Sequence, residues 1–298
     1  MRKYALLAMT CALAACGGGS GGEWHGDYNP ADGVPPALDI PNGAGTIPTW
    51  GNGVVKNMSI AARTADNEDL TFFLNGAGQI TSINFDNREY KVQSDRNEFV
   101  NVTDGVARTL NLVNLGKEAG LTYADFGYIQ ETENHGYYID RDVDVFVGGP
   151  GVYEHSGSNP KDATYTGVAA AYIQAETADG VVKNQISQTT DAKLVTNAIG
   201  TSTLTMNFSK AANPWYDVIY DGTKITLINT GNNVPAAFMV TADMKPDGGP
   251  TGGAPKWYGA PGDTSEVVWR VAQEWEDKTT GREVDMDAVF GGKRQPSE

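Results

Sequence analysis

The chain is poor in the residues that carry most nucleophilic and metal chemistry. Its 298 residues include two cysteines, Cys11 and Cys16, and three histidines, His25, His135 and His155. The sequence has no Gly-x-Ser-x-Gly, no Walker loop, no Gly-x-Gly-x-x-Gly after a strand and no His-Glu-x-x-His. Because no set of nucleophile, base and orienting residue is evident, the sequence favours a binding protein over an enzyme.

Long apolar repeats at helical spacing are also missing, so the fold class that we predict is all-β. Basic residues are fewer than acidic ones: the chain has 22 Lys and Arg and 37 Asp and Glu, which gives a formal net charge of −15. This charge disfavours nucleic acid and anionic membrane surfaces as direct partners, because both are polyanions. It is compatible with a soluble surface or with a basic partner.

The N-terminus reads as a signal peptide over residues 1–15. Arg2 and Lys3 precede a short apolar run, which is followed by Leu13-Ala14-Ala15-Cys16. This ending resembles the bacterial lipobox, which implies cleavage before Cys16 and its lipidation, palmitate included. Position 17 is Gly and not the Asp that often retains lipoproteins at the inner membrane. We therefore expect a lipid-anchored outer-membrane protein at the cell surface; an ordinary secretory signal is the alternative.

Removal of residues 1–15 would take away two basic residues and no acidic ones, so 20 basic residues would face 37 acidic ones, a net charge of −17. No disulfide would be available, because Cys16 would be the one remaining cysteine. Residues 16–53 are rich in Gly and Pro and are predicted to be a flexible tether with a reach of about 30 Å. The alternative is that its end, near Trp50, packs on the folded part.

Two groups of strands follow the predicted tether. Residues 54–120 carry short alternating strands with turn signals at Asn75-Gly76 and Asp86-Asn87, which predict a small antiparallel subdomain. Residues 121–298 carry longer, regularly spaced strands, beginning with 125–131 and 142–147. Their number predicts an up-and-down barrel of approximately eight strands, with a β-sandwich as the alternative.

The longest strand candidate is Ala163–Glu176. Its odd positions are apolar and mostly small, whereas its even positions mix hydroxyls, an aromatic ring and polar ends. Such a strand suits the tapering interior of a narrow barrel. An Ala-rich helix is the alternative, but Thr164, Tyr165, Thr166 and Val168 favour a strand.

The stretches Ala163–Gly167 and Ala288–Arg294 resemble the barrel signatures of the transferrin-binding protein B family. The resemblance implies a handle domain followed by a barrel on a surface lipoprotein, with room for one lobe instead of two. It further implies capture of a host or environmental ligand for iron or haem acquisition, with an outer-membrane receptor or translocator as a further partner. Single-lobe relatives that bind factor H supply the alternative, an interaction or immune-evasion protein without an iron role.

Candidate ligand-binding residues lie in predicted loops. Tyr137, Tyr138, Tyr153, Trp257 and Tyr258 are of the types that dominate interface hot spots, although packing at the barrel rim is an equal alternative.

His135 and His155 are each able, with a Tyr, to ligate haem, which is the one ligand of cofactor type that we consider. The two loops are expected at opposite ends of the barrel, which argues against one shared site. We expect no metal site, because Asp140, Asp142 and Asp144 lack the Gly and Glu that a calcium loop needs, and a solvated strand face explains them better.

Overall fold

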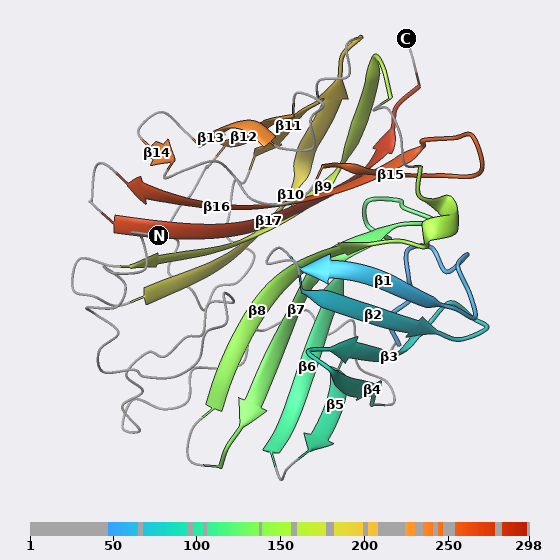
Figure 1. The fold of residues 1–298 in the computed structure, drawn as a ribbon, viewed down its shortest axis with the longest axis vertical. Coiled ribbons are helices and arrows are strands. Elements are labelled where there is room, and N and C mark those ends of the chain that lie inside the picture. The colour runs from blue at the N-terminus through green and yellow to red at the C-terminus, as the bar shows by residue number, and fades with distance from the viewer. Residues whose placement is uncertain are drawn as a thin grey trace.

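The chain folds into two antiparallel β-sheets that pack against each other (Figure 1). This computed structural model confirms the all-β fold class. It describes residues 47–64, 68–93, 98–103, 106–136, 139–155, 160–176, 182–198, 202–207, 224–229, 235–240, 244–246, 254–277 and 282–296. The predicted signal peptide, Cys16, His25, Tyr137 and Tyr138 lie outside these ranges.

The first sheet is a closed barrel of eight strands. In chain order the strands are β1 (Ser59–Thr64), β2 (Asp69–Leu74), β3 (Ile80–Phe85), β4 (Arg88–Val92), β5 (Glu98–Thr103), β6 (Val106–Asn114), β7 (Asp125–Asn134) and β8 (Ile139–Gly148). The barrel closes because β8 pairs with β7 along its whole length and with β1 through Thr64↔Phe146. Aromatic and aliphatic side chains, including Phe72, Tyr90 and Phe99, fill its interior.

The position of the closed barrel differs from the prediction. Strands 125–131 and 142–147 were expected to open the C-terminal barrel, but they form β7 and β8 and complete the first sheet. The physical reason is that both faces of these strands are buried. Ile129 and Phe146 face the interior of the first barrel, whereas Phe126 and Val145 face the second sheet. Apolar alternation therefore did not reveal to which sheet they belong.

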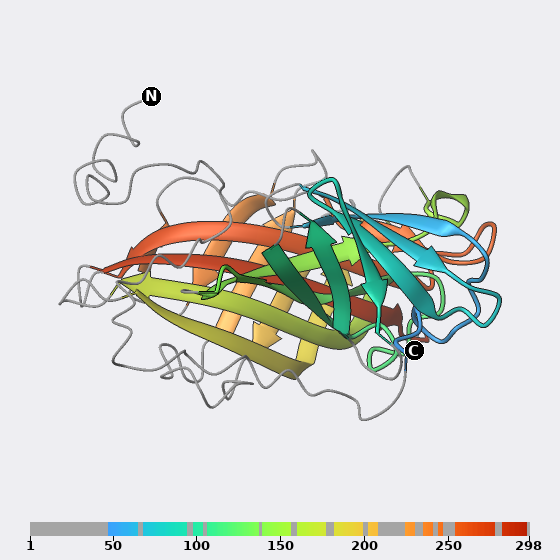
Figure 2. The same ribbon diagram turned by 90° about the horizontal axis from the view of Figure 1, so that it is seen from below.

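The second sheet has nine strands, and Figure 2 shows how it curls. Its strands are β9 (Ala163–Glu176), β10 (Val182–Thr196), β11 (Ser202–Asn207), β12 (Lys224–Asn229), β13 (Pro235–Val240), β14 (Met244–Pro246), β15 (Lys256–Tyr258), β16 (Glu266–Asp277) and β17 (Arg282–Arg294). The order is β13-β12-β11-β10-β9-β17-β16-β14, with β15 also paired to β16. Strands β14 and β15 are short, at three residues each.

The strand Ala163–Glu176 is confirmed as β9, with both bounds as expected. Its odd positions Ala169, Ala171 and Ile173 pack into the cluster on the inner face of the second sheet. Its even positions Val168, Ala170 and Tyr172 instead pack against the first barrel. The face of β9 that carries the hydroxyl groups is therefore covered by the first barrel over its central residues.

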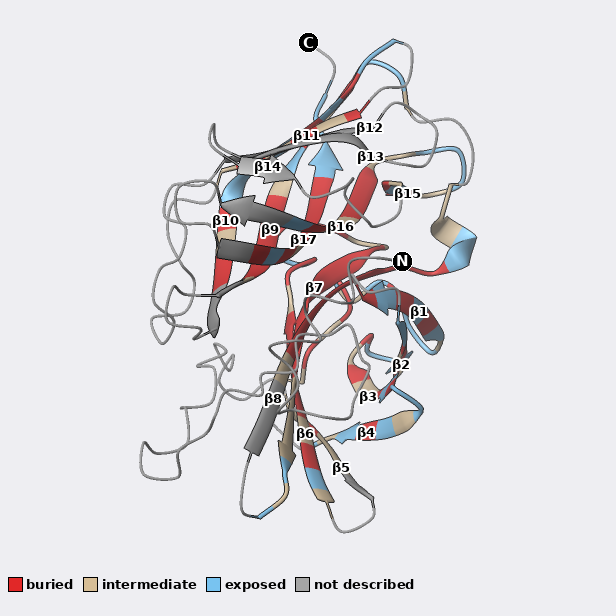
Figure 3. Cartoon of the chain, turned by 60° about the vertical axis from the view of Figure 1, so that its left-hand side comes forward, coloured by how far each residue is buried: buried red, intermediate tan, exposed pale blue. Residues whose placement is uncertain are grey.

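The two stretches that carry the family resemblance are neighbours in space. Strand β17 pairs with β9, and Gly292 lies directly opposite Gly167. A Cβ atom on Gly167 would lie 2.5 Å from the Cα atom of Gly292, so the backbones approach as closely as only Gly permits. Buried residues line both facing surfaces of the two sheets (Figure 3). The strands β9 and β17 lie at the centre of the surface on which the first barrel packs, and β10 and β16 flank them.

The end of the predicted tether belongs to the folded part. Trp50 is fully buried, and its ring lies 5.1 Å from that of Phe72. Its indole Nε1 donates a hydrogen bond to the Tyr123 carbonyl at 2.9 Å. Thr49 forms a β-bridge with Gln79. The alternative in which the chain near Trp50 packs on the first sheet is the one observed, so residues 47–53 are not a free tether.

In the described part of the chain, no helix has the length and apolar character needed to cross a membrane.

Candidate functional site

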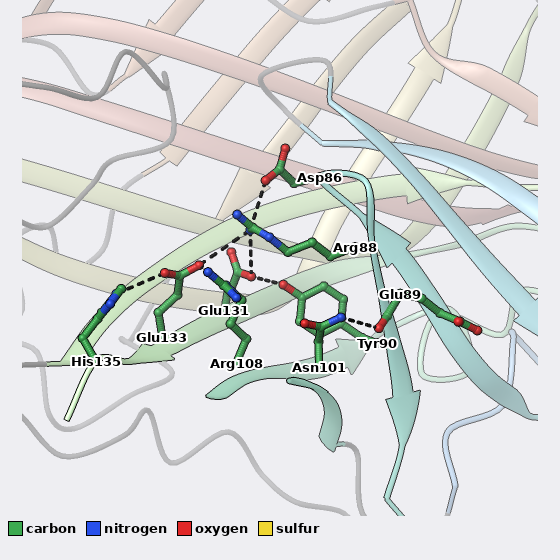
Figure 4. A network of polar contacts seen from close by, with 9 residues as sticks. All are labelled: Asp86, Arg88, Glu89, Tyr90, Asn101, Arg108, Glu131, Glu133 and His135. Atoms are coloured by element: carbon green, nitrogen blue, oxygen red, sulfur yellow. Dashed lines mark hydrogen bonds and ion pairs between the residues drawn. The ribbon is translucent and has the colours of Figure 1, made fainter. Parts of the chain in front are cut away.

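A group of polar side chains lies in the first barrel around the last residues of β7 (Figure 4). We call it the barrel-end cluster. It consists of Asp86, Arg88, Tyr90, Asn101, Arg108, Glu131, Glu133 and His135. These residues come from β4, β5, β6, β7 and the turns adjoining β4 and β7, so four separate stretches of the chain converge on one place.

Strand register explains why charged side chains point into a barrel here. Arg88 lies opposite Phe85 and Tyr90 lies opposite Ile83, and both partners face the barrel interior. The turn before Arg88 has positive φ at Asp86 (46°) and Asn87 (58°), which is the geometry of a two-residue hairpin turn. The sequence prediction of a turn at these two residues is therefore confirmed.

Two guanidinium groups share the carboxylates of β7. Arg108 Nε donates to Glu133 Oε1 at 2.5 Å, while Arg88 Nη1 lies 3.6 Å from the same oxygen and 3.6 Å from Glu131 Oε1. Arg88 Nη1 also contacts Asp86 Oδ2 at 3.0 Å. Tyr90 donates its hydroxyl hydrogen to Glu131 Oε1. These residues therefore form one continuous network of charge-assisted contacts, while Asn101 donates to the Glu89 carbonyl at 2.8 Å.

Negative charge exceeds positive charge in this part of the barrel. Asp142 lies opposite Glu131 in register, and Asp144, two residues further along β8, is buried. Burial raises the pKa of Glu131, and the nearby carboxylates of Glu133 and Asp142 raise it further against the opposing effects of Tyr90 and Arg88. The expectation of a solvated face for the three Asp residues is thus wrong at Asp144, because that face of β8 lines the barrel.

Partial exposure leaves the barrel-end cluster open to a partner. The side chains of Asp86 and Arg88 are 56% and 31% exposed, and that of Glu133 is 21% exposed. Arginine carries a fixed donor fork and is a frequent hot-spot residue at interfaces. Within the described ranges, no three His, Cys, Asp or Glu side chains are placed to hold a metal ion. The arrangement is thus suited to recognition through charge.

The two candidate haem-binding histidines are well separated. His135 belongs to the barrel-end cluster, where its Nε2 lies 3.1 Å from Glu133 Oε2. His155 follows the short 3-10 helix η3 (Gly151–Tyr153), and its Nε2 lies 3.4 Å from the Gly259 carbonyl oxygen. The whole of β8 lies between the two positions, and its ten residues span about 33 Å. One site shared by both histidines is therefore ruled out in this structure.

Two of the expected loop aromatics, Trp257 and Tyr258, belong to the core. Trp257 is 3% exposed and its ring packs at a tilt against that of Tyr165, 5.1 Å away, while Tyr258 is 1% exposed. Tyr258 donates to Glu154 Oε2 at 3.3 Å. The hypothesis that Trp257 and Tyr258 contact a partner is thus corrected in favour of packing. The reason is that they lie on β15, which pairs with β16.

Tyr153 is half-buried where the two sheets meet, with its ring 4.5 Å from that of Tyr123. It too acts mainly as packing. Sequence reasoning missed Arg88, Arg108 and Glu131. A signal was present, because each sits at an interior position near the end of an alternating strand, where a charged residue is unexpected.

No family model and no curated protein matches the chain. Among solved structures, the chain is similar to a double mutant of transferrin binding protein B from Haemophilus parasuis Hp5, with 11% identity and a TM-score of 0.42, over 80% of this chain and 45% of that one.

A single mutant of the same protein gives 10% identity and a TM-score of 0.38 over the same shares of the two chains. Isotype 1 transferrin binding protein B from serogroup B Neisseria meningitidis gives 15% identity and a TM-score of 0.30, over 80% of this chain and 43% of that one. The chain spans less than half of these solved chains. At TM-scores this low, the likeness assigns no function to it.

Proposed function

We propose that this chain is a lipid-anchored surface protein that binds a ligand through the barrel-end cluster. The observation that carries the proposal is the position of that cluster. It is partly exposed and lies at the end of the first barrel opposite to the point where the chain enters the fold. Asp125, at the start of β7, binds the backbone N–H of Gly51 at 2.7 Å, whereas Glu133 lies eight residues further along β7, or about 27 Å away.

The sequence supplies the anchor in this proposal. The lipobox-like Leu13–Cys16 provides the lipid attachment site, and the Gly-rich segment after it provides the tether. A ligand site far from the attached end is accessible to molecules outside the membrane. Ligand binding on a rigid β-scaffold requires no covalent chemistry, so the proposal makes the chain a binding protein and not an enzyme.

The ligand class is tested by capture on the unlipidated chain. A Cys16→Ser variant of residues 16–298 would be immobilised and exposed to host serum or growth medium, beside an Arg88→Ala, Glu133→Gln variant. We expect a retained protein that is lost from the double variant. Retention that is equal on both would show that the barrel-end cluster is not the binding site.

Iron or haem acquisition is the finer proposal, and the sequence resemblance to transferrin-binding proteins favours it. Haem titration of the same protein tests the proposal that haem is the ligand. A Soret shift at stoichiometric haem that is lost in His135→Ala would support haem ligation within the barrel-end cluster. Without such a shift, a protein ligand remains, either an iron carrier or a regulator of immunity as in factor-H-binding relatives.

A further inference from the structure

Three exposed lysines gather where the chain joins the folded part. We call Lys117, Lys193 and Lys293 the lysine patch. Lys193 on β10 and Lys293 on β17 both lie directly opposite Thr166 of β9, one on each side. Residues paired in this way point to the same face, so the two amines flank Thr166 across about 10 Å. Further along the same strands, this face of the second sheet packs against the first barrel.

Lys117 joins this patch through the turn that follows β6. The N–H of Gly120 donates to the Lys117 carbonyl at 3.1 Å, which closes the turn. A Cβ atom on Gly120 would lie 3.7 Å from Lys293 Cδ, so the turn rests against that lysine. Asn52, two residues after Trp50, donates through its N–H to the Leu121 carbonyl at 3.1 Å. The lysine patch and the start of the fold are therefore adjacent.

The patch is basic on a protein that carries a net charge of −15. All three lysines are exposed, and none forms an ion pair with a carboxylate of the described ranges. Glu266, the register neighbour of Lys293, is buried and accepts the N–H groups of Thr122, Tyr123 and Ala124. Three exposed amines without a carboxylate ion pair therefore gather on a molecule of opposite net charge, with the exposed Glu118 and Asp191 close to them in sequence.

We propose that the lysine patch contacts anionic lipid headgroups of the membrane that holds the chain. This inference rests on the proposed function, in which Cys16 carries the lipid. A lysine within a Debye length of an anionic surface is attracted to it, and a basic patch is a common second signal beside a lipid chain. The acidic remainder of the surface is repelled. The fold would thus stand with the patch toward the membrane and the barrel-end cluster away from it.

The patch can be tested without relying on lipidation in the cell. In residues 16–298, Cys16 is the one cysteine, so a maleimide lipid couples there specifically. The coupled protein is placed on phosphatidylcholine vesicles with or without phosphatidylglycerol, and each lysine is acetylated and quantified by mass spectrometry. We expect acetylation of the three patch lysines to fall several-fold on the anionic vesicles only. Lys91, exposed on β4 of the first barrel, serves as the reference and should not change.

Equal acetylation of the patch on both kinds of vesicle would overturn the proposal, as would equal protection of Lys91. Protection by dissolved inorganic phosphate without vesicles would also overturn it, since that would indicate a small-anion site. A Lys117→Gln, Lys193→Gln, Lys293→Gln variant should lose the response of the protein to phosphatidylglycerol, whereas Lys91→Gln should keep it. Failure of the proposed anchor would appear separately, as absence of fatty-acid labelling in cells.

Discussion

The ring of Phe126 lies directly on the backbone of Gly291. A Cβ atom at Gly291 would fall 2.1 Å from Phe126 Cε1, so no side chain fits between the two strands. Phe126 comes from β7 of the first barrel and Gly291 from β17 of the second sheet. The contact therefore joins the two sheets through residues that are more than a hundred positions apart in sequence, and it explains a glycine inside a strand.

Gly291→Ala should destabilise the fold by about 2–3 kcal/mol, because the new methyl group must displace a packed ring. Urea unfolding measures the change. Gly151→Ala is the matched control, since nothing lies within 4 Å of a Cβ atom at Gly151. A Phe126→Ala, Gly291→Ala double variant should show a smaller loss than the sum of the two single variants. Strict additivity would contradict the contact.

Glu266→Gln should cost about 1–3 kcal/mol of stability, because one buried acceptor of backbone N–H groups becomes a donor. Glu266 Oε1 accepts from Thr122 at 2.6 Å, and Oε2 accepts from Tyr123 at 2.9 Å and Ala124 at 3.1 Å. The exposed Glu274 lies on the same strand, and Glu274→Gln should leave the unfolding midpoint unchanged. Equal effects of the two substitutions would show that the link between the sheets does not depend on Glu266.

Asp125 should make stability depend on pH. Burial raises its pKa from 3.8 to about 6, despite N–H donors from Gly51, Asn114, Phe126 and Gly116 that act to lower it. Between these two values the folded chain holds a proton that the unfolded chain has released. The free energy of unfolding should therefore fall as pH rises through this window, by about 3 kcal/mol in total.

Asp125→Asn removes the titrating group, so the difference in unfolding free energy between wild type and this variant isolates its effect. That difference should change across the window from about pH 4 to pH 6 and be constant above it. Urea unfolding at several pH values provides the measurement. A constant difference throughout would mean that the N–H donors offset the burial of the carboxylate.

Trp257→Ala should cost about 3–5 kcal/mol, the usual loss for a large aromatic removed from a core. Val152→Ala should have almost no effect, because Val152 is 73% exposed. Thermal unfolding of both variants decides between the packing role and the partner-contact role of Trp257. A variant that keeps its melting temperature yet loses ligand would restore the partner role.

Sequence reasoning was most accurate where the structural signal lies in residues that are close together in the sequence. The strand Ala163–Glu176, the turn at Asp86-Asn87 and the all-β class were predicted because alternation and turn chemistry are local signals. Membership of β7 and β8 in the first sheet was not predicted, because both faces of these strands are buried and because Phe146 of β8 pairs with Thr64 of β1 across 82 positions in sequence. The barrel-end cluster was missed for a similar reason, since Arg88 and Glu131 become neighbours only when the barrel closes.

The central claim is that a fatty acid is attached to Cys16. Metabolic labelling with a fatty acid tests this claim most directly. Cells expressing the full chain would be fed an alkyne fatty acid, separated into membrane and soluble fractions, and probed for label on the protein. The account predicts label and membrane recovery for the wild type, and loss of both for Cys16→Ala. An unlabelled wild type, or a Cys16→Ala variant that keeps its label and its place in the membrane fraction, would contradict it.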